Sequence, residues 1–198
     1  MGRLPGHHSC DIISVARWLP RPVARHRHGQ LAARRAGAAT TGVQRMGVTV
    51  EGPFLRRSSV CEPVLRSLPQ WFAIKEAADQ YIQDIEGLPT LLARDGDSIV
   101  GFLTLVVHSA YSAEIHVMGV RPEYHRRGVG AALVRAAERN LRQRGVEYLQ
   151  VKTLSPQRKD KNYAHTRQFY YALGFRPLEE FPELWGPENP CLQMIKGL

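Results

Sequence analysis

The chain has 198 residues, 43% of them hydrophobic, which suits one domain with its own core and at most one appendage. The formal charge of +9 is uneven, because residues 1–47 hold eight arginines against one acid while the other 151 residues carry 19 basic and 17 acidic side chains. That nearly balanced larger part excludes a protein that binds nucleic acid over its whole surface, and the longest apolar run, nine residues at 99–107, is far short of the roughly 20 residues of a membrane helix.

Residues 1–47 are rich in Arg, Ala, Gly and His and have no sustained apolar period, so they are not expected to form part of a fold. The composition fits a disordered basic tail or a cleaved organellar transit peptide, which is also rich in Arg and poor in acids. Translation from Met46 would remove the segment altogether. We therefore divide the chain into a basic extension, 1–47, and one domain, 48–198.

The domain begins with helical structure and a hairpin. Apolar residues at three- and four-residue steps between Trp71 and Ile85 predict one helical face that ends near Gly87. Two β-rich runs, 90–94 and 98–108, follow with a turn at 95–97 between them. The second run is apolar on both faces, so we expect a strand that is central in the sheet and buried on both sides.

The rest of the domain alternates strands and helices. The pattern predicts a strand at 112–120, a helix at 128–144, a strand at 146–153, a helix at 162–173 and a last strand at 191–196. A hairpin followed by strand, helix, strand, helix and strand indicates an α/β (α+β) protein with a mixed sheet and helices packed on it.

The sharpest local motif lies between the strand at 112–120 and the next helix. Gly128 and Gly130 stand at the start of that helix, where glycines let the backbone approach a ligand and turn successive N–H groups toward it. Arg126 and Arg127 add positive charge to the same end of the helix. The segment therefore predicts an anion site. A dinucleotide site of the Rossmann type fits poorly, because Leu133 stands where a third glycine or alanine is needed and the next strand does not end in an acid.

The segment resembles the acyl-coenzyme A loop of the GCN5-related N-acetyltransferases, the GNAT family, whose pattern is Arg/Gln-x-x-Gly-x-Gly/Ala. His125 stands where that family usually has Arg or Gln, and the resemblance extends over about residues 65–196. It implies the GNAT acyl-CoA N-acyltransferase fold, with a central, mostly antiparallel mixed sheet, and acetyl-CoA as cosubstrate. The coenzyme-binding residues that we expect are Met118, Gly119, Val120, His125, Arg126, Arg127, Gly128, Val129, Gly130 and Ala131.

The same resemblance suggests catalytic residues. Glu114 precedes Gly128 by 14 residues, the spacing of the general base in the histone-modifying branch of the family. The segment 169–175, Phe-Tyr-Tyr-Ala-Leu-Gly-Phe, resembles a motif whose tyrosine lies near the coenzyme sulfur, and this assigns proton donation to Tyr170. Tyr163 stands where the family often has a coenzyme-contacting Asn.

Strand alternation adds further expectations. Alternation places His116 and Met118 on the face of Glu114, which makes His116 the second candidate base. The resemblance also implies that a backbone N–H donates to the oxyanion where the strand separates from its neighbour, and Gly119 or Val120 would supply it.

Evidence for the acceptor and the compartment is thinner. Acids and an indole at 179–188 suit a cationic amine, with Glu180 and Trp185 as substrate residues. The three widely separated cysteines match neither a disulfide framework nor a zinc pattern, so we expect no metal and a reducing, cytoplasmic location, or an organellar one if the extension is a transit peptide.

Three functions remain open from the sequence. The first is an N-acetyltransferase that acts on a primary amine of a small molecule, without membrane or nucleic-acid partners and with a homodimer left open. The second is an acetyltransferase of protein lysines or N-termini. The third is a non-enzymatic coenzyme A-binding module whose tail contacts nucleic acid.

Overall fold

The computed structural model describes residues 47–198, and the predictions made for residues 1–46, the tail, the transit peptide and the start at Met46, lie outside the described residues. The described part forms strands and α-helices, together with one short 3-10 helix at Pro122–Tyr124. In chain order these are β1 (Thr49–Phe54), α1 (Ser58–Arg66), α2 (Lys75–Gly87), β2 (Thr90–Asp95), β3 (Ser98–Val107), β4 (Ser112–Val120), α3 (Val129–Arg142), β5 (Tyr148–Leu154), α4 (Lys161–Ala172), β6 (Arg176–Phe181) and β7 (Cys191–Gly197).

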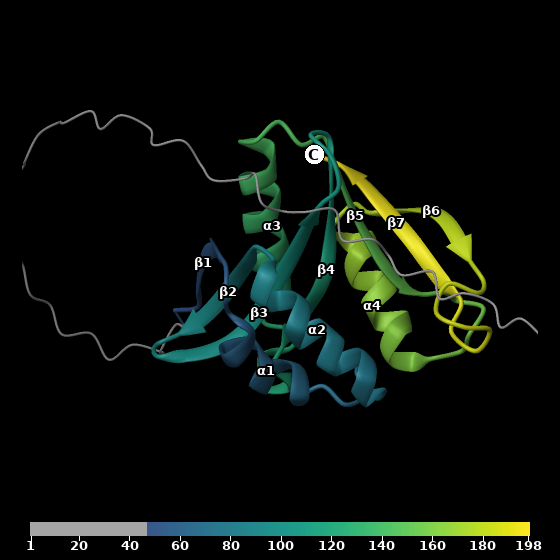
Figure 1. The fold of residues 1–198 in the computed structure, drawn as a ribbon, viewed down its shortest axis with the longest axis horizontal. Helices are drawn as coiled ribbons and strands as arrows, with labels where there is room; N and C mark the ends of the chain where they lie inside the picture. Colours follow the sequence, from purple (N-terminus) through teal and green to yellow (C-terminus); the bar gives the residue numbers. More distant parts are fainter. Residues whose placement is uncertain (1–46) are drawn as a thin grey trace, which may run out of the picture. The chain divides into compact units, whose positions relative to one another are not determined.

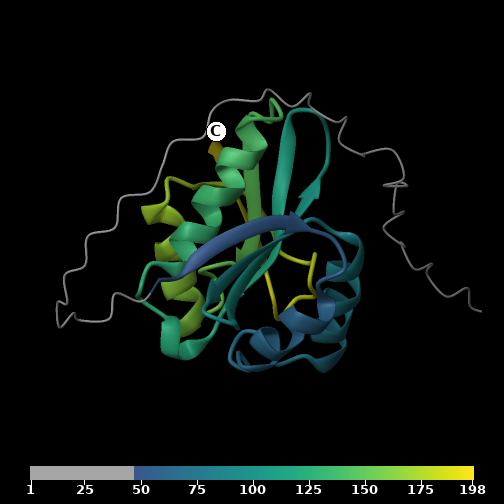
Figure 2. The same cartoon turned by 90° about the vertical axis from the view of Figure 1, so that its left-hand side faces the viewer.

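The strands form one sheet in the order β1-β2-β3-β4-β5-β7-β6. Every neighbouring pair is antiparallel except β4 and β5, which are parallel. Figure 2 shows α1 and α2 on one side of the sheet and α3 and α4 on the other. The predicted fold class, a mixed and mostly antiparallel sheet flanked by helices, is confirmed.

The parallel pair of strands separates partway along its length. Residues Ser112–Ile115 of β4 pair with Tyr148–Val151 of β5, and the register ends there. Beyond that point β4 continues to Val120 beside β3, and β5 continues to Leu154 beside β7. Figure 1 shows the two strands side by side near the C-terminus and apart at their other ends. This divergence leaves backbone groups of both strands facing each other without a ladder.

Two apolar clusters hold the helices on the sheet. One joins the sheet to α3, through residues such as Leu103 and Leu133, and the other joins it to α1 and α2, through residues such as Phe102 and Ile85. Phe102 and Leu103 are neighbours on β3 and both are fully buried. The strand is therefore buried on both faces, as its sequence predicts.

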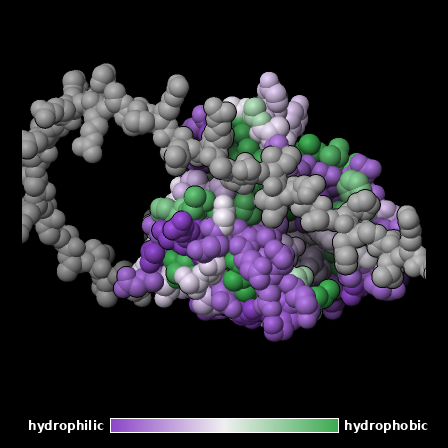
Figure 3. Space-filling model, viewed as in Figure 1, coloured by the Kyte–Doolittle hydropathy of each residue, from purple (hydrophilic) through white to green (hydrophobic). Residues whose placement is uncertain are grey.

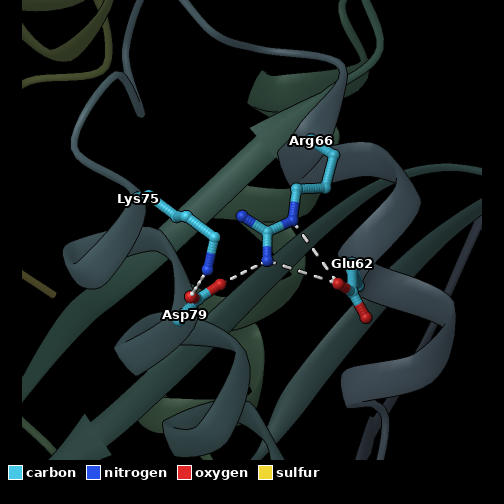
Figure 4. Close-up of polar contacts among 4 residues, drawn as sticks. All are labelled: Glu62, Arg66, Lys75 and Asp79. Atoms are coloured by element: carbon cyan, nitrogen blue, oxygen red, sulfur yellow. Dashed lines mark hydrogen bonds and ion pairs between the residues drawn. The ribbon is translucent and has the colours of Figure 1, made fainter.

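The outward side of α1 and α2 is polar. Hydrophilic side chains gather over these helices in Figure 3, and Figure 4 shows how four of them link the two helices. Arg66 of α1 contacts Glu62 one turn earlier and Asp79 of α2, and Lys75 approaches the same Asp79 carboxylate at 2.6 Å. Burial is therefore confined to the sheet side of this helix pair.

Three of the strands and α-helices were not predicted from the sequence. Two of them, β1 and β6, are the edge strands of the sheet. Both contain a proline, Pro53 or Pro177, which edge strands tolerate and which weakens a strand pattern. The third, α1, has nine residues with Pro63 inside it. Within residues 47–198, no helix is long and apolar enough to cross a bilayer.

Candidate active site

A β-bulge lies in the middle of β4. The ladder with β3 passes from the pair Thr104–Val117 to the pair Leu105–Ile115, so His116 is an extra residue without a partner on β3. The pairing of β4 with β5 ends at Ile115, one residue before the bulge. The bulge therefore marks the point where the two parallel strands begin to diverge.

The bulge changes which side chains share a face of β4. His116 lies on the same side of the sheet as Glu114 and contacts Asp84 of α2. Val117 also faces this side and belongs to the apolar cluster beneath α1 and α2. Met118 packs in the other cluster, and its Cε lies near Gly130 of α3. The prediction that Met118 shares the face of Glu114 is wrong, because an extra residue shifts the alternation of every later side chain.

The loop before α3 has the backbone conformation of an anion cradle. Arg126 has a φ of 61° and Gly128 a φ of 82°, so the chain turns through left-handed conformations at two alternate residues. The first backbone bond of the helix runs from the Ala132 N–H to the Gly128 carbonyl. Within residues 47–198 no hydrogen bond uses the N–H groups of Val129, Gly130 or Ala131, and these groups stand at the positive end of the helix dipole.

The cradle also has room for a ligand. A Cβ added at Gly128 would meet no atom within 4 Å. The free N–H groups, the two arginines and this open space together fit a pyrophosphate. That the coenzyme binds there remains a prediction.

His125 fastens the cradle to the end of β4. Its Nε2 lies 2.7 Å from the Val120 carbonyl oxygen, and its ring meets the Trp71 ring edge-on at 5.8 Å. The side chain that replaces the family's usual Arg or Gln therefore has a structural contact of its own. A coenzyme contact by His125 stays a prediction.

Backbone direction separates the two predicted oxyanion donors. The Arg121 N–H donates to the Val100 carbonyl of β3 at 2.9 Å. Because alternate residues of an antiparallel strand direct their backbone groups to the same neighbour, Gly119 also faces β3, whereas Met118 and Val120 face the divergence. Val120 is therefore the better placed of the two.

Glu114 lies at the centre of a polar cluster on the α2 side of the sheet. It is 6% exposed, and its Oε2 atom lies 2.9 Å from His108 Nε2, 3.2 Å from Gln150 Nε2 and 2.7 Å from Lys152 Nζ. Burial raises the pKa of this carboxyl, but the hydrogen bonds from His108 and Lys152 outweigh it, so the net pKa is lowered. Glu114 is therefore a firmly ionised carboxylate.

His116 belongs to a second pair of an imidazole and a carboxylate. Its Nε2 lies 2.8 Å from Asp84 Oδ2 of α2, and its ring meets the ring of Tyr81 at 5.4 Å. Burial raises the pKa of Tyr81, and the negative charges of Glu114 and Asp84 raise it further. Tyr81 therefore stays neutral beside the imidazole.

Tyr170 lies on the opposite side of the sheet, in α4. It is 4% exposed, packs edge-on against Phe169 and Phe175, and its hydroxyl has no hydrogen-bond partner within the described part of the chain. Burial raises the pKa of this phenol, so it remains protonated at neutral pH. Such a hydroxyl is available as a donor to a ligand.

The connection between α1 and α2 reaches α4 through Trp71. The indole N–H donates to Thr166 Oγ1 at 3.1 Å, and the Tyr163 hydroxyl donates to the Trp71 carbonyl at 3.0 Å. Tyr163 occupies the position where the family often has an Asn, and here it holds this connection in place. Its pKa is raised to about 12 by burial, so it remains a donor.

Of the two predicted substrate residues, Glu180 lies in β6 and Trp185 in the connection that follows it. Glu180 of β6 accepts a hydrogen bond at 2.7 Å from Ser155 Oγ, just after β5, and contacts Gln157. Trp185 is 39% exposed in the connection between β6 and β7. The carboxylate of Glu180 thus has local partners, whereas the indole faces solvent.

The polar partners of Glu114 and His116 were not predicted. Lys152 had a usable signal, because it is a charged side chain in an apolar strand and alternation places it on the face of Gln150. His108 and Asp84 gave no such signal, because their contacts depend on how a loop and α2 dock on the sheet. Within residues 47–198 there is no group of three His, Cys, Asp or Glu that could hold a metal ion.

Comparison with known proteins agrees with this architecture. A solved structure from Desulfovibrio desulfuricans assigned to the GNAT family has a TM-score of 0.67 and 17% identity, over 76% of this chain and 99% of that one. An aminoglycoside 6'-N-acetyltransferase complexed with coenzyme A has a TM-score of 0.60 and 18% identity, over 75% of this chain and 96% of that one. The ribosomal-protein-S18-alanine N-acetyltransferase of Escherichia coli has a TM-score of 0.60 and 17% identity, over 76% of this chain and 93% of that one. No curated protein matches the chain. The sequence pattern of the acetyltransferase (GNAT) family matches residues 60–175, more than half of the chain. The chain therefore belongs to the GNAT family of acetyltransferases.

Proposed function

We propose that the protein is an acetyl-CoA-dependent N-acetyltransferase that acts on the primary amine of a small molecule. The observation that carries the proposal is the cradle of free N–H groups at Val129, Gly130 and Ala131, which follows the segment of β4 that has separated from β5. A pyrophosphate in the cradle and an extended acyl-pantetheine arm along the divergence would together use both features.

The residues of the loop would bind and orient the coenzyme. Backbone N–H groups and the helix dipole suit the pyrophosphate, and the exposed side chains of Arg126 and Arg127 add positive charge. Along β4, the backbone of Met118 and Val120 faces the divergence and can pair with the amides of the arm, as a neighbouring strand would. His125 and Gly119 hold this end of β4 in place.

The chemistry needs a base, an oxyanion donor and an acid. An aliphatic ammonium has a pKa near ~10.4, so a base must take its proton before the nitrogen can attack the thioester. Glu114 and His116 are the two candidates, and both lie on the α2 side of the sheet at the start of the divergence. Of the two N–H groups that face the divergence, that of Met118 lies nearer the candidate bases and suits the oxyanion, and that of Val120 can pair with the arm. Tyr170, protonated and buried, suits the departing sulfur.

The acceptor is expected on the α2 side, opposite α3 and α4. Asp84 and Glu114 give this side carboxylates, and a carboxylate field favours a cationic amine over an anionic acceptor. Trp185 offers an exposed indole in the β6–β7 connection that could cover such a cation, with Glu180 nearby in sequence. A cytoplasmic location is part of the proposal, since Cys61 and Cys191 are both buried and unpaired.

The proposal is tested with the full chain and acetyl-CoA. Thiol release is measured with spermidine, tyramine, kanamycin and an alanyl peptide as separate acceptors. Release with a small amine, and acetylated product of the matching mass, is the expected result. Release with the peptide alone would favour a protein acetyltransferase, and tight coenzyme binding without release in any arm would favour a binding module.

A further inference from the structure

Two pairs of an imidazole and a carboxylate lie on the α2 side of the sheet. His108 pairs with Glu114 at 2.9 Å, and His116 pairs with Asp84 at 2.8 Å. The two pairs differ in position along β4. Glu114 lies within the segment that still pairs with β5, whereas His116 is the bulged residue at which the pairing has ended.

Glu114 is poorly suited to accept a proton. Its Oε2 atom receives hydrogen bonds from three side chains, and the ammonium of Lys152 is the closest of them at 2.7 Å. The carboxylate is buried, and its pKa is lowered by these partners. Protonation of Glu114 would remove the counter-ion of the half-buried Lys152 ammonium, which is costly.

His116 has one ring nitrogen engaged and one available. When Nε2–H donates to Asp84, the lone pair of the neutral ring lies on Nδ1. No described residue forms a hydrogen bond with Nδ1, and the side chain is 24% exposed. Asp84 and Tyr81 of α2 contact the ring, and Glu114 of β4, with its partner Lys152 of β5, acts electrostatically on Tyr81.

We propose that Asp84 is a positioning residue that holds His116 with Nδ1 as the proton acceptor, and that His116 rather than Glu114 is the base of the reaction. The inference rests on the proposed N-acetyltransferase function. Nδ1 takes one proton from the acceptor ammonium, which leaves a neutral amine and an imidazolium paired with the Asp84 carboxylate. The amine nitrogen then bonds to the thioester carbon and the carbon–sulfur bond breaks. As the new bond forms, the nitrogen loses a second proton and the departing sulfur gains one. The imidazolium then returns its proton to water.

The tautomer of the His116 ring is tested first, in the absence of any acceptor amine. In the full chain labelled with nitrogen-15 at histidine, imidazole NMR at pH above the titration of the ring should show the Nε2–H tautomer for His116, identified by its absence in His116→Gln. Asp84→Asn should give a mixture of tautomers. An Nδ1–H tautomer in the unaltered protein would overturn the proposal, whatever the enzyme's activity.

The pH profile tests the base itself, with the fastest acceptor of the panel above. His116→Gln should lower kcat by a factor of about 10²–10⁴ and remove the acidic limb of the kcat/KM profile. Asp84→Asn should lower kcat with little change in KM, because the ring loses the hydrogen bond that fixes its tautomer. Asp84→Glu should restore part of the loss.

His108→Gln is the matched control, since it breaks the other imidazole–carboxylate pair. Its acidic limb should stay where it is in the unaltered protein. A limb that persists in His116→Gln and vanishes in Glu114→Gln would assign the base to Glu114 and overturn the proposal. Absence of thiol release from the unaltered protein with every acceptor would instead refute the proposed function, while the tautomer result would still stand.

Discussion

The cradle before α3 can be tested with two glycines of the same conformation. Gly128 and Gly145 stand at the two ends of α3, with φ of 82° and 79°, and a Cβ at either position would meet no atom within 4 Å. The left-handed conformation costs an alanine at either position about 1–2 kcal/mol of folding free energy. The smaller entropy of the unfolded alanine chain offsets part of this cost. Each variant should therefore lose about 1 kcal/mol of stability, a fall in Tm of about 2–4 °C for a domain of this size.

Only the first of these variants should affect coenzyme binding. The Gly128 Cβ would project into the open space beside the free N–H groups of the cradle, whereas Gly145 lies roughly 20 Å away along the helix. Loss of one hydrogen bond to a charged pyrophosphate costs about 1.5–3 kcal/mol. That cost corresponds to a roughly 10- to 150-fold weaker Kd for coenzyme A.

The assay is calorimetric titration of each full-length variant with coenzyme A, alongside thermal unfolding with and without the ligand. Gly145→Ala should bind like the unaltered protein although it is equally destabilised. Equal weakening in both variants would mean that helix stability, and not the cradle, governs binding. Unchanged affinity in Gly128→Ala would refute a pyrophosphate at this loop.

Three further predictions concern charged groups of the described part. Glu138 is 5% exposed and pairs with Lys196 at 2.6 Å, so Glu138→Ala should lower the free energy of unfolding in urea by about 3–5 kcal/mol. Removing its half-exposed partner Arg142 should lower it by under about 1 kcal/mol, and equal losses in the two variants would contradict the role of burial. Glu114 has a lowered pKa, so its contribution to stability is present above the ordinary glutamate value of 4.5 and is lost as the pH falls through the lowered value. Glu114→Gln should therefore flatten the decline of stability in acid. An unchanged dependence of stability on pH would show that the ion pairs of Glu114 do not persist in solution. Arg66→Ala removes the link between α1 and α2 drawn in Figure 4. Because these charges are exposed, the substitution should lower Tm only slightly, and the effect should vanish at high salt. A large fall in Tm that is independent of salt would point to packing instead.

Local features of the site could be predicted from the sequence. The cradle is one, because Gly128 acts through its own backbone conformation and through the helix that follows. The strand that carries Glu114 is another, since its residue range agrees with β4 at both ends. Such features depend on residues that are close in the chain, so a pattern of spacing is enough to find them.

Features that depend on two distant segments could not be predicted. The bulge at His116 arises from how β4 aligns with β3, and no periodicity within β4 alone indicates where an extra residue falls. The contact between His116 and Asp84 requires α2 to dock on the sheet in one particular position. Glu180 similarly has partners in the turn after β5, 23 and 25 residues earlier in the chain.

The divergence of β4 and β5 also creates two strand edges inside the sheet. Exposed edges invite pairing with foreign strands, and proteins protect them with bulges and inward-pointing charged side chains. Here the Val120 carbonyl of β4 is taken by His125 at 2.7 Å, and the Leu154 carbonyl of β5 by the buried guanidinium of Arg167 at 2.7 Å. The bulge and these two side chains leave only a short stretch of each edge open, so a long polypeptide strand cannot add to it. The opening is therefore suited to a narrow, extended molecule, and its short edges offer little backbone for another copy of the chain to pair with.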